Sequence, residues 1–420
     1  MRDSGKIMRE DYQAIVDEVS ALLGTPATLE GRDFALIAFG AHQSDGEGNE
    51  PALDPVRTRS ILGRGSTAEV RAWFESLGIT KATEPVRIDP EPAAGVVHGR
   101  ICLPVRYAGV VYGYIWLIDD GAIDLSDPRL VSAMAVTSRI GALLAAEART
   151  EARTGELLRE MLGVGGGERS GAGEETIAQL REALGTDGSG PLALVAITPW
   201  QVAEGADAAG TSASAQPHVT ARCVLPAATG RGAARATSAH SLAALVRLRS
   251  MDGLDPARTA AGRLLRTPGS PANGTRTGTS TGTSTGTAGI SAPRRGLAEL
   301  LPAWREAMAA ARAARAEEAL GPVAEWTAIG PYRLLTSLHT DAGPDPVLRA
   351  LLRPAHAELA RTAEVFLDSA GQAGRTAAAL GIHRQTLYYR LSRVESLTGL
   401  DLDEGAARLL LHMALKAQRL

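Results

Sequence analysis

Hydrophobic positions near the end of the chain predict two short helices joined by a glycine turn. Residues 375–380 form an Ala-rich helical segment, and Gly381 ends it because glycine readily adopts the left-handed backbone conformation. A second helix is predicted from about Arg384. Its apolar residues recur at helical spacing and make one buried stripe, Leu387, Leu391, Val394 and Leu397. This pattern is typical of a helix-turn-helix.

The first 150 residues mix helical and strand patterns. The predicted elements are a helix over 9–23, a strand over 34–39, a helix over 69–77, a hairpin over 101–119 with its turn at Ala108-Gly109, and a long helix from Asp127 to about Ala148. We expect the last helix to bury Leu130, Met134, Ile140, Leu143 and Leu144.

The second strand of the hairpin carries an unusual share of the chain's aromatic residues. Strand alternation places Tyr112, Tyr114 and Trp116 on one face and Val111 on the other. The aromatic face has two interpretations. It lines a pocket for a small molecule, or it covers the sheet against a helix or a partner subunit.

The middle of the chain has a second α/β pattern after a linker. Residues 151–162 continue the long helix, and a Gly-rich run follows. Strands are predicted over 192–198, 218–225 and 241–248, and an Ala-rich helix over 297–320. The Gly-Thr-Ser repeat over 267–289 cannot bury enough apolar surface to fold, so we expect a disordered insertion within about 251–289.

The second helix near the end of the chain has a polar, positively charged outer face. Residues 369–394 contain four arginines and no Asp or Glu, although the whole chain has a net charge of −3. Such a surface suits the major groove of DNA, where Arg reads guanine, Gln reads adenine and outer arginines meet phosphate. A basic, solvated helix in a bundle is the alternative. The candidate DNA-contacting residues are Arg375, His383, Arg384, Gln385, Thr386, Tyr389, Arg390 and Arg393.

The last predicted helix follows Gly399 and Asp401. We expect it to join the core through Leu409, Leu410, Met413 and Leu415.

Length and composition bound the class of protein. The 420 residues allow two to four domains, and a hydrophobic content of 45% is that of a globular chain. Cys102 and Cys223 match no metal or redox spacing, which suits a reducing compartment. The charged start of the chain lacks a signal peptide's apolar run, and no stretch approaches the roughly 20 apolar residues of a membrane span. We therefore expect a cytoplasmic protein.

Catalytic motifs are absent from the sequence. There is no Walker A loop, no GxSxG turn, no HExxH helix and no convergent acidic cluster. The GGGER run at Gly165 lies in the linker and not between two strands, so it does not resemble a nucleotide cyclase turn. We expect no enzymatic activity, no catalytic residue, no metal and no cofactor.

Residues 376–415 provide a specific resemblance. They contain His-Arg-Gln-Thr-Leu at 383–387, Tyr-Arg-Leu at 389–391 and Leu-Thr-Gly-Leu-Asp-Leu at 397–402. These runs resemble the C-terminal DNA-binding domain of PucR-type or CdaR-type bacterial transcriptional regulators over about the last 75 residues. Gln385 replaces the usual Asn, Gln372 replaces a frequent Asn cap, and Tyr388 stands at a position that is often basic.

The resemblance implies a multidomain α+β chain. Family members often combine a GAF-like sensor and a degenerate GGDEF-like domain with the helix-turn-helix. The expected layout is a GAF-like α/β sensor at 8–150, a linker at 151–174, a GGDEF-like α/β domain at 175–342 and an all-α helix-turn-helix domain at 345–420.

The expected function is that of a ligand-responsive regulator of transcription. Its implied partners are double-stranded promoter DNA, a second copy of the chain in a homodimer or higher oligomer, and a small-molecule effector. Two alternatives remain at this point. One is a nucleotide cyclase or phosphodiesterase built on the middle domain, and the other is a sensor or adaptor that does not bind DNA.

Overall fold

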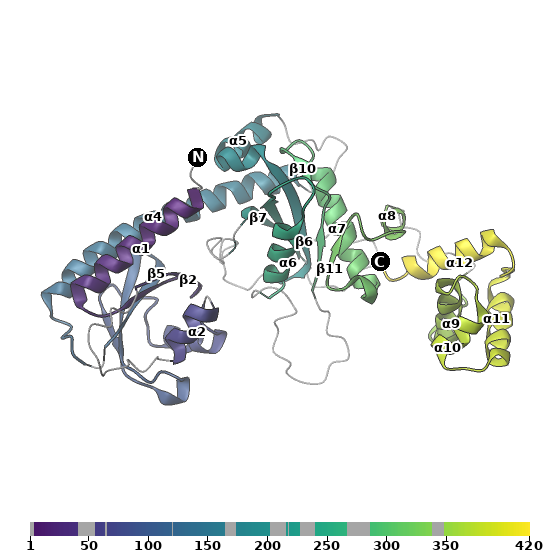
Figure 1. Cartoon of the computed structure of the whole chain (residues 1–420), viewed down its shortest axis with the longest axis horizontal. Helices are drawn as coiled ribbons and strands as arrows, with labels where there is room; N and C mark the ends of the chain where they lie inside the picture. Colours follow the sequence, from purple (N-terminus) through teal and green to yellow (C-terminus); the bar gives the residue numbers. More distant parts are fainter. Residues whose placement is uncertain are drawn as a thin grey trace. The chain divides into compact units, whose positions relative to one another are not determined.

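The computed structural model describes residues 4–40, 55–63, 65–119, 121–163, 174–201, 216, 218–226, 240–266, 286–337 and 348–420. The chain divides into two compact units, Met1–Glu156 with Glu204–Pro217, and Leu157–Ala203 with His218–Leu420. Each unit has its own mixture of helices and sheet (Figure 1). The Gly-rich part of the expected linker, 164–173, lies outside the described residues.

The first unit contains an antiparallel sheet in the order β2-β1-β5-β4-β3. The predicted hairpin is confirmed, with Ala108 and Gly109 both at positive φ in its turn. Strand β1 is an element that the sequence pattern did not reveal. The elements are α1 Ser4–Leu23, β1 Ala27–Gly31, β2 Leu36–Phe39, α2 Pro55–Gly63, α3 Ala68–Ser76, β3 Val86–Ile88, the 3-10 turn Pro92–Ala94, β4 Arg100–Tyr107, β5 Val110–Ile118 and α4 Pro128–Met161.

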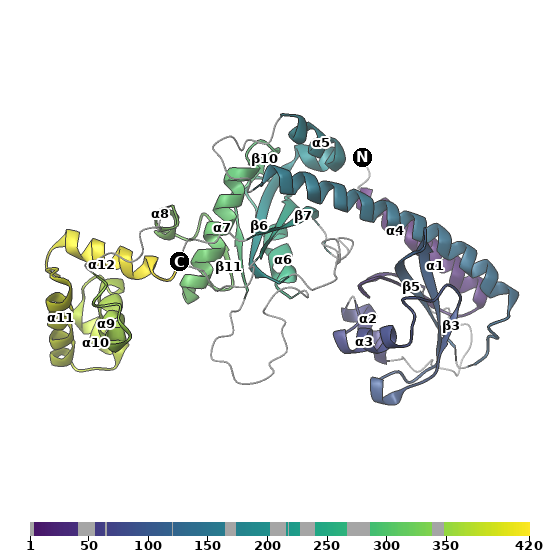
Figure 2. The same cartoon turned by 180° about the vertical axis from the view of Figure 1, so that it is seen from behind.

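Helices α1 and α4 lie side by side on one face of this sheet (Figure 2). Their buried residues include Val16 and Val19 from α1 and Leu130 and Ile140 from α4. Gly141 lets α4 approach closely, because a Cβ there would lie 2.4 Å from the Arg106 carbonyl oxygen. The expectation that Leu143 is buried is wrong, since its side chain is 41% exposed and points away from this core.

The aromatic face predicted for β5 is only partly correct. Tyr114 and Trp116 pack with α2 and α3, but Tyr112 packs against the opposite cluster, beside α1 and α4. A β-bulge pairs Val105 with Gly113 and the next residue, Arg106, with Val111, which leaves Tyr112 as the extra residue. Such an extra residue shifts the alternation of side chains between the two faces. Val111 is therefore on the aromatic side, contrary to the simple alternation.

Helix α4 also corrects the expectation that nothing in the chain approaches a membrane span. An 18-residue window of α4 has a mean hydropathy of 1.4 and is long and apolar enough to cross a membrane on composition alone. Of that window, 44% is buried inside the protein. Packing against the sheet through Leu130, Ala133 and Ile140 accounts for much of its apolar character.

The second unit contains a mixed sheet in the order β11-β9-β6-β8-β7, with β10 paired to β6. Alternate residues of β6 enter two cores. Leu192 and Leu194 face α5 and α7, and Val195 and Ile197 face α6. The elements are α5 Glu174–Leu184, the 3-10 turn Gly185–Ser189, β6 Pro191–Trp200, β7 Val219–Pro226, β8 His240–Arg247, α6 Asp255–Leu264, β9 Thr287–Ile290, β10 Arg294–Arg295, α7 Leu300–Ala316, the 3-10 turn Glu318–Leu320, β11 Val323–Glu325 and α8 Tyr332–Leu335.

The predicted insertion is too wide at both ends. Residues 255–264 form α6, whose Ala257, Ala260, Ala261 and Leu264 make a buried stripe at helical spacing. Thr287–Ile290 form the buried strand β9. The centre of the repeat, 267–285, lies outside the described residues.

The end of the chain is helical, as predicted. Its elements are the 3-10 turn Pro354–His356, α9 Ala357–Asp368, α10 Ala373–Leu380, α11 Arg384–Thr398 and α12 Gly405–Ala417. Helix α12 buries Ala407, Leu411 and Leu415 at i, i+4 and i+8. The prediction that Leu409 and Leu410 join the core is wrong, because they lie off this stripe and are 60% and 38% exposed.

The last turn of α12 joins the middle domain inside the second unit. Met413, Ala417 and Leu420 pack against a cluster that includes Tyr332 and Leu335 of α8. Lys416 Nζ lies 3.0 Å from Glu317 Oε2 and 3.1 Å from both Glu364 Oε1 and Asp368 Oδ2. Burial lowers the pKa of Lys416, but hydrogen bonds to these three carboxylates outweigh burial and raise it above its ordinary value.

We expect Gly289→Ala to destabilise the middle domain strongly. A Cβ at Gly289 would lie 1.9 Å from the Ala307 carbonyl oxygen and 2.3 Å from the Ala311 nitrogen, both main-chain atoms of α7. Overpacking against rigid backbone should reduce the free energy of unfolding by about 3 kcal/mol or more. Urea unfolding of the full chain measures this change.

Gly262→Ala is the matched control, because Gly262 lies within α6 and its nearest neighbour is the flexible end of Arg266, 3.7 Å away. Alanine there should stabilise the helix by about 0.5–1 kcal/mol. Wild-type stability of G289A would contradict the close approach of α7 and β9.

Candidate nucleic-acid interface

The turn between α10 and α11 sets the direction of the second helix. Gly381 has φ 66° and ψ 32°, and its N–H donates to the carbonyl oxygens of Ala377 and Ala378. His383 is the N-cap of α11, and its Nδ1 accepts from the Gln385 N–H at 3.3 Å. His383, one of the predicted DNA contacts, therefore also fixes the first turn of α11.

The predicted inward stripe of α11 is confirmed. Leu387, Leu391 and Val394 are buried in a core shared with α9, α10 and α12, and Leu397 is partly buried against it. Ala377 of α10 lies in the same core, and its small side chain allows the two helices to cross closely. Thr376 is fully buried, and its hydroxyl donates to the Gln372 carbonyl oxygen at 2.9 Å. The core therefore determines which residues of α11 face outward.

The outward face of α11 gathers most of the predicted contact residues. Tyr389 is 73% exposed at the start of the second helical turn. Tyr388 is 58% exposed beside it, so it belongs to the same surface although it was not among the predicted contacts. Arg375 is also exposed but comes from α10. The exposed predicted residues that α11 and its N-cap bring together are His383, Arg384, Gln385, Thr386, Tyr389 and Arg393.

Arg390 differs from the other predicted contacts. Its side chain is only 19% exposed, and Nη2 lies 2.5 Å from Glu358 Oε1 of α9. Its Nη1 also donates to the Thr362 hydroxyl at 3.5 Å. We infer that Arg390 ties α11 to α9, because its guanidinium is already held by groups inside the domain.

The charge of this surface is positive and local. Within the described residues, Arg375, Arg384 and Arg393 have no ion-pair partner. The acidic residue of α11, Glu395, is turned toward the following loop, where Oε1 accepts from the Leu402 N–H at 3.0 Å. Cations and hydrogen-bond donors at a helix N-terminus suit contact with phosphates and base edges in a major groove.

The other predicted site residues lie inside the first unit. Tyr114 and Trp116 are 2% and 7% exposed, and their rings lie 5.3 Å from Phe34 and 4.5 Å from Phe74 respectively, between centroids. They therefore form part of a packed aromatic cluster, which Tyr112 does not join.

The part of the chain that the structure describes holds no group of three or more His, Cys, Asp or Glu placed to bind a metal ion. Cys102 and Cys223 are buried free thiols. Burial raises the pKa of the Cys223 thiol to about 12 and that of Cys102 further. Both thiols are therefore un-ionised at neutral pH, which is unsuited to metal or redox chemistry.

Comparison with known families decides the class of this C-terminal region. Residues 359–417 match the family model described as the PucR C-terminal helix-turn-helix domain. This region is therefore similar to the helix-turn-helix domain of PucR-type proteins. The match includes α10, α11, α12 and nearly all of α9, so it contains every predicted DNA-contacting residue. The resemblance to PucR-type and CdaR-type regulators is thereby confirmed for this domain.

Three regulators are similar to parts of the chain. The DNA-binding transcriptional activator AdeR of Bacillus subtilis is 25% identical over 168 residues, 38% of each protein. The transcriptional activator PmfR of Paenarthrobacter nicotinovorans is 43% identical over 65 residues, 16% of this chain and 12% of PmfR. The carbohydrate diacid regulator of Escherichia coli is 41% identical over 87 residues, 20% of this chain and 23% of that protein. The matches thus span at most 38% of these relatives.

The salt dependence of DNA binding can distinguish the roles of Arg390 and Arg393. Arg393→Ala should lower the slope of log affinity against log salt by about one, because one phosphate contact is lost. Arg390→Ala should leave the slope near the wild-type value, since Arg390 pairs with Glu358. DNA binding titrated between low and moderate salt measures both slopes. An equal loss in the two variants would show that Arg390 also meets phosphate.

Proposed function

We propose that this chain regulates transcription by sequence-specific binding to promoter DNA through its PucR-type helix-turn-helix. One observation carries the proposal. The core holds α11 so that an exposed, acid-free N-terminal face carries Arg384, Gln385, Thr386 and Tyr389. Two of the similar proteins are named as transcriptional activators and the third as a regulator, which agrees with this role.

The residues of this face divide by chemistry. Arg384 and Gln385, on the first turn of α11, suit bidentate contacts with guanine and adenine. Arg375 and Arg393 lie farther out and suit phosphate contacts. One short recognition helix reads few base pairs, so useful specificity requires two copies on adjacent half-sites. We therefore propose that the functional unit is a homodimer or a higher oligomer.

We propose that the preceding domains sense an effector and transmit its signal to the helix-turn-helix. We propose that they do not catalyse a reaction. In the first unit, helices α1 and α4 lie on an antiparallel sheet, and this arrangement supports the GAF-like assignment. Helices on both faces of the second sheet support the GGDEF-like one. A small-molecule effector in the first unit would act on DNA binding through α4, which contributes Leu157 and Leu158 to the second unit's core. We place this activity in the cytoplasm.

Base-specific binding can be tested with two substitutions on the first turn of α11. Arg384→Ala and Gln385→Ala should each weaken binding to the selected site by about 1–3 kcal/mol and relax preference at one base position. Selection of bound genomic fragments, followed by sequencing, gives the preferred site for each variant. Arg139→Ala, on the exposed surface of α4, is the control and should bind as the wild type does. Absence of selective binding to any genomic fragment at low salt would refute the proposal.

The absence of catalysis is tested separately. Incubation of the full chain with nucleoside triphosphates or cyclic dinucleotides and Mg²⁺ should give no turnover. Measurable product would instead favour the enzyme alternative for the middle domain.

A further inference from the structure

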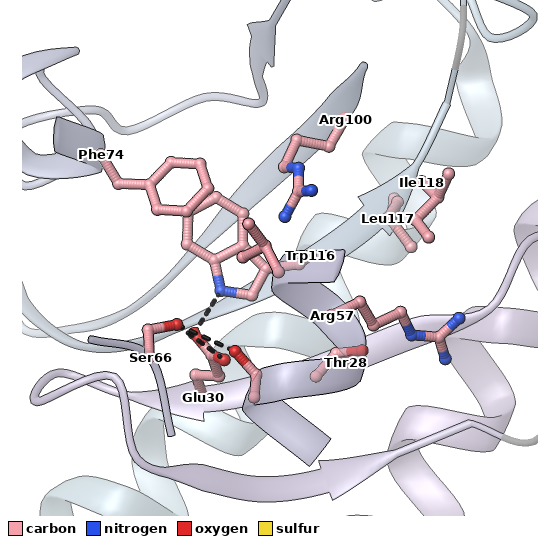
Figure 3. Close-up of a pocket in the computed structure, with 11 residues that line it drawn as sticks. Thr28, Glu30, Arg57, Ser66, Phe74, Arg100, Trp116, Leu117 and Ile118 are labelled. Carbon is pink, nitrogen blue, oxygen red and sulfur yellow. Dashed lines mark hydrogen bonds between the residues drawn. The ribbon is translucent and has the colours of Figure 1, made fainter. Parts of the chain in front are cut away.

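Aromatic side chains in the first unit pack around one another and serve its core. Trp116 and Phe74 line a cavity of about 20 Å³ beside Glu30, whose Oε2 accepts from Trp116 Nε1 at 3.0 Å (Figure 3). A space of this size holds about one water, so it has no room for an organic ligand. The aromatic side chains of α11 lie in a different setting, at the surface of the DNA-binding domain.

Two neighbouring tyrosines of α11 are exposed without a partner inside the protein. The chain has seven tyrosines, and Tyr389 and Tyr388, at 73% and 58% exposure, are the two most exposed. Neither side chain makes a hydrogen bond or a ring contact within the described residues. A tyrosine ring carries a large apolar area, and a partner that covers it removes this area from water. Each ring is therefore available to an external partner.

The position of Tyr389 on α11 directs it away from the core. An α-helix turns by about 100° per residue, so Tyr389 lies about 200° around the axis from the buried Leu387. Gln385 lies at the corresponding place one turn earlier. Tyr388 is about 100° from Leu387, at the side of the helix. Tyr389 therefore projects from the centre of the outward face, and Tyr388 projects from its edge.

The chemistry of the major groove limits what such a ring can contact. Base edges present hydrogen-bond donors and acceptors there, and their apolar feature is the 5-methyl group of thymine. A ring pressed against a polar edge would displace water without replacing its hydrogen bonds. Residues 384–394 contain no Asp or Glu, so the face can approach DNA without charge repulsion. A thymine methyl group is thus the favourable partner for a ring at the centre of this face.

We propose that Tyr389 reads the 5-methyl group of a thymine in each DNA half-site through the apolar surface of its ring. The proposal rests on the proposed DNA-binding function and names the base that this residue selects. Gln385 and Tyr389 are four residues apart, about 6 Å along the helix axis. Successive base pairs rise by about 3.4 Å. The thymine therefore lies about two base pairs from the base that Gln385 contacts.

The experiment uses the full chain and the DNA site that it selects from genomic fragments. Each thymine of the site is replaced in turn by deoxyuridine, which removes the methyl group and keeps every hydrogen-bonding group of the base. Titration at fixed salt gives the affinity for each DNA. One replacement in each half-site should weaken wild-type binding by about fourfold, as expected for the loss of one buried methyl group. It should lie about two base pairs from the position that Gln385→Ala relaxes.

Three variants assign the methyl contact to one ring. Tyr389→Ala should bind more weakly and should no longer distinguish thymine from deoxyuridine at that position. Tyr389→Phe keeps the ring and should retain the fourfold difference. Tyr388→Ala is the matched control, an exposed tyrosine one residue away, and should also retain it. Each result is a ratio between two DNAs measured under the same conditions, so a general loss of affinity cannot imitate it.

Several results would overturn the assignment. They are equal wild-type affinity for all the substituted sites, a difference that persists in Tyr389→Ala, and a difference that is lost in Tyr388→Ala. Loss in Tyr389→Phe would assign the contact to the phenolic hydroxyl and would refute it as well.

The two proposals fail in distinguishable ways. Selective binding without a methyl effect would refute the thymine contact and leave the proposed DNA-binding function standing. If no genomic fragment is selected, the proposed function fails and the thymine contact fails with it.

Discussion

The buried stripe of α11 is the constraint on which the functional surface depends. Leu387, Leu391 and Val394 are at most 7% exposed, and burial of each such side chain contributes about 1.5–3 kcal/mol. Rotation of the helix by one residue would expose this stripe and bury arginines in its place. The N-cap at His383 and the left-handed Gly381 fix where the helix begins. Hydrophobic packing on one side therefore sets the orientation of every polar group that we propose to contact DNA on the other.

Glycine and alanine form several of the contacts between helices and sheets in this chain. Aromatic residues make up only 4% of the sequence. Helix α7 instead packs on β9 through Ala307 and Ala311 over Gly289, and α4 approaches the first sheet over Gly141. Close approach of backbones increases dispersion contacts without bulky side chains. The same solution brings Ala377 against α11 in the DNA-binding domain.

The sequence predicted elements whose signal is local and failed where the outcome depends on pairing between distant segments. Helical spacing located α11 and its core, and a turn at Ala108-Gly109 located the hairpin. Tyr112 was misplaced because a bulge depends on the partner strand. Arg390 was predicted to contact DNA because its partner, Glu358, is 32 residues away in the chain and the sequence pattern does not reveal the pairing. Helix α6 was missed because a polar repeat beside it dominated the composition of that region.

The end of α12 has a practical meaning for work with fragments of this chain. Lys416 joins two carboxylates of α9 to Glu317 of the middle domain, and Leu420 packs beside Tyr332. A fragment cut just before α9 would keep the recognition helix but leave the apolar end of α12 exposed and one ion-pair partner missing. A fragment that carries the helix-turn-helix is therefore better designed to keep the whole second unit, because α7, beside which α12 ends, packs in turn on β6 and β9.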